Sequence, residues 1–244
     1  MEKKAAYATL AEWFEYLNDD CGYEQWSQYL IEKLRAFPVK TGLDAGCGGG
    51  WFTRAFARAG YAVTGMDISP EMLDVAQRKA LSDGVKGEYL LGDIVKTKLP
   101  KRFDFVTAIN DCVNYIPKEK LRSAFKNVRS ALNKKGIFLF DVSSERKFRE
   151  KIANTVSVDD REDVTYLCFH RTEDEKTTMD VTLFVKKHGR GYERLDERHV
   201  QYIYKEVEIL AALNECGFDL LCAEGFLGED KEHSDRLCFL AQKR

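Results

Sequence analysis

Glycine and carboxylate residues recur along this chain at places where a nucleotide-like ligand could bind. Residues 43–50 read LDAGCGGG, so four glycines occupy eight positions directly after a short apolar stretch. Glycine permits positive φ and lets a ligand approach the backbone without meeting a Cβ. Asp67, Asp93 and the pair Asn110-Asp111 each close a further apolar stretch. Because carboxylates accept hydrogen bonds from ribose hydroxyls and from an adenine amino group, the pattern favours a ligand with a nucleoside part.

Strands and helices must alternate to position these residues. The segments between the apolar stretches predict helices, one of which begins at Ser69-Pro70, a capping side chain followed by a proline. The apolar stretches themselves predict strands near 41–45, 61–67, 87–93, 103–111 and 134–142. Such alternation predicts an α/β fold, a Rossmann-like and mostly parallel sheet with helices on both faces. The glycines and carboxylates then meet at the carboxyl edge of the sheet, where ligands bind in such folds.

The remainder of the chain departs from this alternation. Apolar residues at three- and four-residue steps predict two helices within 5–36, and polar–apolar alternation over 155–204 predicts antiparallel strands. Residues 205–242 return to a helix followed by two strands. We therefore predict three parts: an N-terminal helical lid (1–40), a cofactor-binding domain (41–142 and 205–244) and an inserted antiparallel β subdomain (143–204). The insertion would cover the active site or form a dimerisation surface.

Composition excludes several classes of partner. The formal net charge of −2 over 244 residues gives no global attraction to nucleic acid or to an anionic membrane. The N-terminus lacks the apolar core of a signal peptide, and no apolar run is long enough to span a bilayer. The seven cysteines are scattered without a C-x-x-C pair, and the four histidines share no metal-ligand spacing. We expect a cytoplasmic protein with reduced thiols and no metal site.

Two ligand classes use a strand–glycine–helix unit of this kind, dinucleotides and S-adenosylmethionine. The dinucleotide fingerprint G-x-G-x-x-G needs a third small residue for close packing of the helix. Counting from Gly46 and Gly48, that position holds Trp51, which is a poor fit. A phosphate-binding P-loop is also excluded, since no G-K-[ST] follows.

The chain resembles the class I S-adenosylmethionine-dependent methyltransferases. The motifs that carry the resemblance are LDAGCGGG (43–50), VTGMDISPEML (63–73), YLLGDI (89–94), FDFVTAINDCVNYI (103–116) and LNKKGIFLFDV (132–142). The resemblance implies a seven-stranded sheet whose last strand is antiparallel, with S-adenosylmethionine as the cofactor. The N-terminal segments YATLAEWFEYL and GYEQWSQYL resemble a subgroup that acts on small molecules, including amino-sugar N-methyltransferases. This chain has Phe14-Glu15 where that subgroup often has Tyr-Asp.

From the motif positions we predict the residues of the site. Those expected to bind the cofactor are Tyr7, Trp26, Gly46, Gly48, Asp67, Ile68, Met72, Asp93, Ile94 and Asn110. Those expected to act on the methyl acceptor are Asp111, Tyr115 and His170. His199, on another predicted strand of the insertion, could also reach over the methyl group.

The most favoured function is methyl transfer to a nitrogen or oxygen atom of a small molecule, by a monomer or a homodimer. Three alternatives stay open: an RNA or protein acceptor, a non-catalytic module that only binds the cofactor, and a dinucleotide oxidoreductase. The N-P-P-Y motif of many base-amine methyltransferases is absent, and NDCVNY stands near its place. Basic residues in 118–135 alternate with apolar ones on one predicted helix, as on a solvated face.

Overall fold

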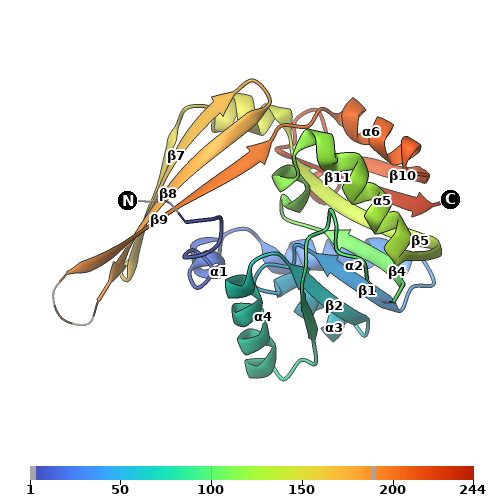
Figure 1. Ribbon diagram of the computed structural model, residues 1–244, viewed down its shortest axis with the longest axis horizontal. Helices are drawn as coiled ribbons and strands as arrows, with labels where there is room; N and C mark the ends of the chain where they lie inside the picture. The colour runs from blue at the N-terminus through green and yellow to red at the C-terminus, as the bar shows by residue number, and fades with distance from the viewer. Residues whose placement is uncertain (1–3, 100, 188, 190) are drawn as a thin grey trace.

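Two sheets organise the chain in the computed structural model, which describes residues 4–99, 101–187, 189 and 191–244 (Figure 1). Residues 1–3 of the predicted lid, residue 100 of the predicted cofactor-binding domain and residues 188 and 190 of the predicted insertion lie outside the described residues. The main sheet contains β1 (Thr41–Ala45), β2 (Ala62–Asp67), β3 (Glu88–Leu91), β4 (Phe103–Ala108), β5 (Leu132–Ser143), β10 (Phe218–Gly225) and β11 (Arg236–Lys243).

The strand order of the main sheet is β10-β11-β5-β4-β1-β2-β3. The strands from β3 across to β5 run parallel, whereas β11 is antiparallel to both β5 and β10. The predicted seven-stranded, mostly parallel sheet with an antiparallel last strand is therefore confirmed. The carboxyl ends of β1, β2, β3 and β4 lie along one edge, since these four strands are neighbours and parallel.

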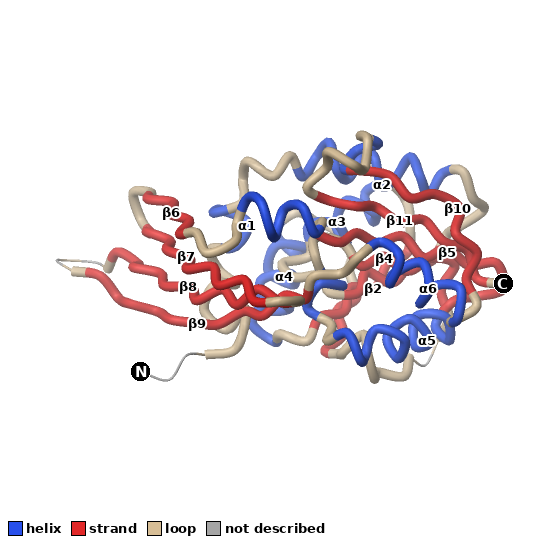
Figure 2. The backbone as a smooth tube through the Cα atoms, turned by 90° about the horizontal axis from the view of Figure 1, so that it is seen from above, coloured by secondary structure: helices blue, strands red, loops and turns tan. Residues whose placement is uncertain are grey.

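Helices cover both faces of the main sheet, as predicted. The helices α2 (Tyr23–Arg35) and α3 (Trp51–Arg58) pack on one face, and α5 (Leu121–Ala131) and α6 (Glu206–Glu215) on the other, while α4 (Pro70–Ser82) lies along β2 and β3. Figure 2 shows α2 on one side of the strands and α5 with α6 on the opposite side. Alternate residues of the central strands face the two layers: Phe105 packs towards α3, and Val106 packs among the residues of α5. Burial of these apolar surfaces is the main driving force for the fold.

Short helical turns connect the larger elements. They are η1 (Cys112–Tyr115), η2 (Lys118–Lys120), η3 (Lys147–Lys151) and η4 (Phe226–Gly228). Ser69 caps α4 by accepting a hydrogen bond from the Met72 amide at 3.1 Å, with Pro70 in the first turn, as the sequence predicted. Within the part of the chain that the structure describes, no helix is long and apolar enough to cross a membrane.

The second sheet is antiparallel throughout and extends away from the main one (Figure 1). Its strands are β6 (Val156–Asp160), β7 (Val164–Glu173), β8 (Lys176–Lys186) and β9 (Tyr192–Tyr202), in that order. The predicted antiparallel strands are confirmed, and β6 is a further strand that the sequence did not single out, because it is short and largely exposed. One face of this sheet packs Cys168, Val181 and Leu183 against Leu10 of the N-terminal segment.

The first predicted helix is wrong. Residues 6–13 form successive turns, and α1 (Phe14–Leu17) is only four residues long. The amides of Tyr7, Thr9 and Leu10 donate to the carboxylate of Glu197 at 3.1, 2.9 and 3.2 Å. Because these amides bind one carboxylate and do not form helical hydrogen bonds, the backbone of residues 6–13 is not a helix, and Tyr7 has a φ of 65°. The second predicted helix is confirmed as α2, although it packs on the main sheet. The three-part division of the chain stays a prediction.

A buried carboxylate under the glycine loop makes stability depend on pH. Asp44 of β1 is 1% exposed and accepts hydrogen bonds from the hydroxyls of Thr53 at 2.6 Å and Thr107 at 2.9 Å. Burial outweighs these bonds and raises the pKa of Asp44 from 3.8 to about 6. A raised carboxyl pKa means that the contribution of this group to stability is complete below pH 3.8 and is lost as the pH rises through about 6.

We therefore expect the stability of Asp44→Asn relative to the wild type to increase by roughly 2.5 kcal/mol as the pH rises from 4 to 8. Urea unfolding at several pH values measures this difference. Asp104→Asn is the matched control, since hydrogen bonds from Thr41 and Asn133 outweigh burial and hold the pKa of Asp104 below its usual value. The control should show no such drift between pH 5 and pH 8. Parallel curves for Asp44→Asn and the wild type would overturn the assignment.

Candidate active site

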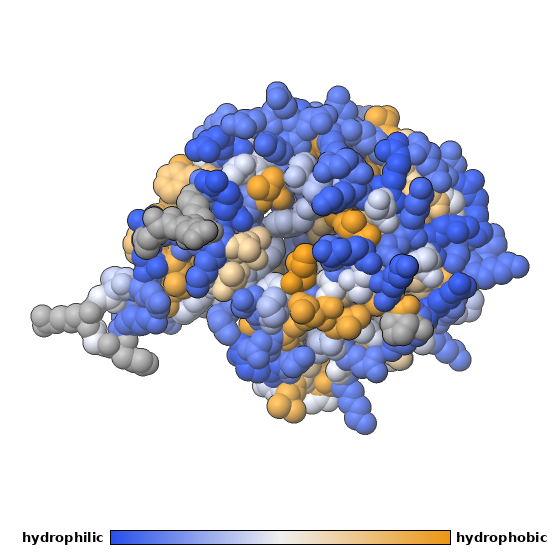
Figure 3. Space-filling model, in the orientation of Figure 1, coloured by the Kyte–Doolittle hydropathy of each residue, from blue (hydrophilic) through white to orange (hydrophobic). Residues whose placement is uncertain are grey.

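A pocket of about 330 Å³ lies at the carboxyl edge of the main sheet. The loops after β1, β2, β3 and β4 line one side, and residues of the N-terminal segment line the other. In the space-filling view a hollow lies between the second sheet and the main one, with apolar side chains along its margin (Figure 3). Its volume lies within the range of small-ligand sites.

The glycine loop after β1 presents bare backbone to the pocket. Gly46 and Gly48 have φ values of 72° and 52°, in the left-handed region that favours glycine. A Cβ on Gly46 would lie 2.3 Å from Sγ of Cys112, whereas a Cβ on Gly48 would meet no atom closer than Met72 at 3.8 Å. The first glycine is therefore required for packing against the neighbouring loop. The second leaves open space for a ligand against the main chain.

Asp67 joins this loop to the end of β2. One of its carboxylate oxygens accepts the Gly48 amide at 2.8 Å, and the other accepts the Ser69 amide at 2.9 Å. The side chain is 8% exposed, and burial raises its pKa although both amides oppose the shift. Each carboxylate oxygen has a second lone pair, so the group can still accept from the two hydroxyls of a ribose.

The loop after β3 forms the next part of the pocket wall. Asp93 accepts the Val95 amide at 2.8 Å, and its own amide donates to the hydroxyl of Thr97 at 2.8 Å. These bonds fix the backbone of the turn, and Asp93 lines the pocket together with Ile94. Across the pocket Ile68 is 67% exposed, which suits an apolar side chain that stacks on a planar ring.

Two residues after β4 are held in an unfavourable backbone conformation. Asn110 and Asp111 have φ values of 63° and 65°, and their amides donate to the Asp141 carboxylate at 2.7 and 3.1 Å. Arg236 donates to Asp111 at 2.8 Å and also to Asp141, while its guanidinium lies 4.4 Å from the ring centroid of Trp26. Left-handed conformations cost energy for residues with a Cβ, so this buried ion-pair network maintains the turn. The turn directs Asn110 into the pocket wall.

Most of the predicted residues meet at this pocket. Of those expected to bind the cofactor, all but Trp26 line it: Tyr7, Gly46, Gly48, Asp67, Ile68, Met72, Asp93, Ile94 and Asn110. Of those expected to act on the acceptor, Tyr115 lines it. The roles of these residues stay predictions.

Three predicted residues lie elsewhere. Trp26 is 2% exposed and packs edge-on against Phe52 and Phe226, so it belongs to the core. Asp111 faces Arg236. Burial alone would raise the pKa of Asp111, but the charges of Arg236 and Lys147 outweigh burial and lower that pKa, so Asp111 is a poor base. His170 on β7 pairs with the hydroxyl of Ser157 at 3.0 Å and does not line the pocket.

Tyr23, the first residue of α2, also lies at the site, and the sequence did not predict it. It lines the pocket, its ring stacks on Trp51 with centroids 5.0 Å apart, and its hydroxyl is buried without a hydrogen-bond partner among the described residues. Buried hydroxyls are nearly always paired, so this one favours a polar ligand group beside it. The segment GYEQWSQYL held the signal, because Gly22 marks the start of the helix. Tyr23 is therefore the first residue of α2 and lines the pocket, whereas Tyr29, the second tyrosine of the segment, does not.

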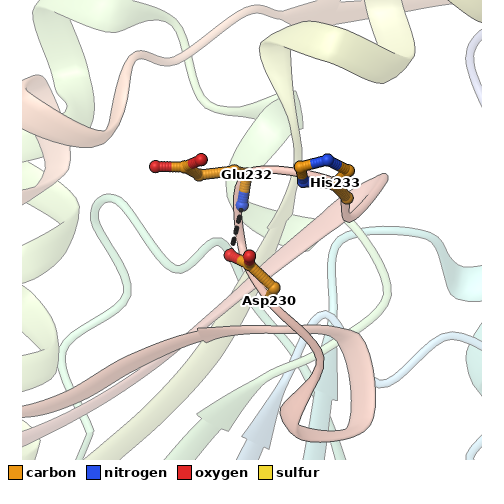
Figure 4. Close-up of side chains that lie close together, drawn as sticks. All are labelled: Asp230, Glu232 and His233. Carbon is orange, nitrogen blue, oxygen red and sulfur yellow. Dashed lines mark hydrogen bonds between the residues drawn. The ribbon is translucent and has the colours of Figure 1, made fainter.

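A group of possible metal ligands lies apart from the pocket. Asp230, Glu232 and His233 lie on the loop before β11, and the carboxylate of Asp230 accepts the Glu232 amide at 3.0 Å (Figure 4). All three residues are exposed, and exposed acidic groups are common without an ion. We assign no metal site to them.

Known methyltransferases are similar to this chain in sequence and in fold. A family model described as a methyltransferase domain matches residues 43–136. A protein from Geobacillus sp. (strain WCH70) that is assigned to the methyltransferases is 31% identical, over 97% of this chain and 99% of its own. The structure of a S-adenosylmethionine-dependent methyltransferase from Clostridium acetobutylicum ATCC 824 has a TM-score of 0.88 at 28% identity, over 97% of this chain and 98% of that one. An amino pentose methyltransferase from Micromonospora echinaspora, solved with S-adenosylmethionine bound, shares the fold at a TM-score of 0.77 and 21% identity, over 100% of both chains.

Three glycine substitutions separate packing from ligand binding. Gly46→Ala combines backbone strain with a collision at Cys112, so we expect the largest loss of thermal stability. Gly48→Ala adds a methyl group that faces the pocket, so we expect loss of affinity for S-adenosylhomocysteine with only the cost of the strained φ. Calorimetric binding and thermal melting measure both effects.

Gly84→Ala is the matched control. Gly84 has a φ of 65°, and an added Cβ would meet nothing within 4 Å, away from the pocket. It should lose about 1 kcal/mol of stability, as Gly48→Ala should, while affinity stays unchanged. If Gly48→Ala bound S-adenosylhomocysteine as tightly as Gly84→Ala, the loop would not approach the ligand.

Proposed function

This chain belongs to the class I S-adenosylmethionine-dependent methyltransferases, and we propose that it transfers the methyl group to a nitrogen or oxygen atom of a small-molecule acceptor. The bound cofactor supplies a methyl group on a positively charged sulfur, whose C–S bond breaks as the acceptor's electron pair forms the new bond to carbon. The protein aligns the two groups and keeps water out. No metal ion is needed for this chemistry.

In this proposal the loop after each strand binds a different part of the cofactor. The backbone at Gly46 and Gly48 holds the methionine portion, Asp67 accepts from the ribose hydroxyls, and Asp93 with Ile94 holds the adenine. Three further residues complete the cofactor's surroundings, namely Ile68 and Met72 by apolar contact and Asn110 near the amino-acid end. The buried unpaired hydroxyl of Tyr23 supplies another donor there.

The observation that carries the proposal is a pocket closed over by the N-terminal segment and lined with aromatic rings. The rings are those of Tyr7, Phe14, Tyr23, Trp51, Phe52 and Tyr115. Apolar walls with a few placed polar groups are typical of small-molecule sites. Among the described residues that line the pocket, Lys120 alone carries a cationic side chain, whereas nucleic-acid sites rely on many. The fold shared with an amino pentose methyltransferase supports the same acceptor class.

Transfer of label from methyl-labelled S-adenosylmethionine tests this proposal. The protein is incubated with the small-molecule fraction of a cell extract and, separately, with its RNA and protein fractions. We expect label to appear in the small-molecule fraction, together with formation of an equal amount of S-adenosylhomocysteine. The variant Gly48→Ala, which should bind the cofactor weakly, should transfer no label. Label in RNA or protein would refute the small-molecule acceptor. Cofactor binding without transfer to any fraction would indicate a binding module.

A further inference from the structure

A chain of hydrogen bonds leads from the pocket to a buried histidine and carboxylate. The phenol oxygens of Tyr7 and Tyr115 lie 2.9 Å apart, and that of Tyr115 lies 2.9 Å from Nδ1 of His199. Nε2 of His199 lies 2.6 Å from a carboxylate oxygen of Glu197. Both tyrosines line the pocket, whereas His199 is 3% exposed and Glu197 is fully buried behind them.

The direction of these bonds follows from the carboxylate. An ionised carboxylate only accepts, so Nε2 of His199 carries a proton. When the ring holds this one proton, Nδ1 is an acceptor. Tyr115 must then donate to Nδ1, which leaves its oxygen to accept from Tyr7. Both phenol protons are committed in this way, and no further hydrogen bond joins the Tyr7 phenol to a described residue. The phenol oxygen of Tyr7, at the pocket end of this series of hydrogen bonds, can therefore accept a hydrogen bond but has no free proton to donate.

Glu197 is held firmly enough to set this direction. Besides His199, it accepts the amides of Tyr7, Thr9 and Leu10 and the Thr9 hydroxyl at 2.8 Å. Burial alone would raise its pKa, but the hydrogen bonds from His199 and Thr9 outweigh burial and lower it. The same carboxylate thus stays ionised and places Tyr7 at the pocket.

We infer that Tyr7, Tyr115 and His199 form a proton path that takes the proton lost by the acceptor during methylation. The inference rests on the proposed function and deepens it, since it restricts the acceptor atom to one that bears hydrogen, N–H or O–H. Tyr7 and Tyr115 touch the pocket. His199 acts through Tyr115, and Glu197 acts through His199 and Tyr7, so these two are positioning residues.

The proton balance is simple. Methylation leaves the acceptor atom with one proton more than its stable product needs. That proton moves to the oxygen of Tyr7, the phenol proton of Tyr7 moves to Tyr115, and that of Tyr115 moves to Nδ1 of His199. The result is an imidazolium beside the Glu197 carboxylate, with both phenols restored. The proton returns to water along the same path after the product leaves.

Other titratable groups also interact with this path. Tyr166 of β7 interacts electrostatically with Tyr7 and Glu197. Asp111 acts on both phenols, and Asp67 acts on that of Tyr7. Across β8 the partner of His199 is Met179, which does not titrate. Burial raises the pKa of both Tyr7 and Tyr115, so the phenols act as carriers that stay protonated between transfers.

Nitrogen NMR of the protein labelled at its four histidines tests the direction without an acceptor. We expect His199 to be the neutral tautomer with hydrogen on Nε2, and Tyr115→Phe to shift its Nδ1 signal strongly. Tyr7→Phe should leave that signal close to its wild-type position. Hydrogen on Nδ1 at neutral pH would overturn the inference, because the pocket end would then be a donor.

The pH dependence of label transfer to the small-molecule fraction tests the path in action. The ratio of wild-type to His199→Gln rates should rise with pH, because the path works only with an unprotonated Nδ1, and then level off at about a hundredfold or more. Tyr115→Phe should give the same trend, and His233→Gln, an exposed histidine on the loop before β11, should match the wild type. A ratio that does not change with pH would indicate a structural role and refute the path. If the wild type labels no small molecule, the proposed function fails, and the tautomer alone decides the inference.

Discussion

The site depends on the bonds that Asp67 makes with two backbone amides. Its carboxylate accepts from Gly48 and Ser69, and so ties the loop after β1 to the loop that starts α4. Glycines at positive φ have no side chains to hold them, and the carboxylate supplies that restraint. Asp44 beneath it and Asp141 at the end of β5 act similarly on their own neighbours. Buried carboxylates are costly, and here hydrogen bonds from amides, hydroxyls or Arg236 offset part of that cost while fixing the edge of the sheet.

The second sheet and the N-terminal segment together close one side of the pocket. Glu197 of β9 binds the amides of residues 7, 9 and 10, so parts of the chain about 190 positions apart close one pocket. The apolar side chain of Leu10 packs on the same sheet. The second sheet therefore does more than cover the pocket, since it also sets where Tyr7 lies.

The sequence predicted the elements and site residues that depend on local periodicity. It did not predict those that depend on contacts between distant parts of the chain. Strand–helix alternation and strand-end motifs gave the main sheet and the residues at its edge, because each depends on neighbours in the sequence. The helix expected near residues 5–18 fails since Glu197 binds its amides, and Asp111 is held away from the pocket by Arg236. Alternation places His170 and His199 on strands without saying which strand lies next to the pocket. That strand is β9, whose neighbour η1 carries Tyr115, whereas β7 lies two strands further out.

Calorimetric titration of S-adenosylhomocysteine into Asp67→Ala tests the central role of this carboxylate most directly. Asp74→Ala on α4 is the matched control, since its carboxylate is 67% exposed and pairs with Arg78 on the same helix. The loss of charge-assisted bonds worth roughly 1.5–3 kcal/mol predicts about ten- to a hundredfold weaker binding by Asp67→Ala and unchanged binding by Asp74→Ala. Equal affinity in both variants and the wild type would contradict the account.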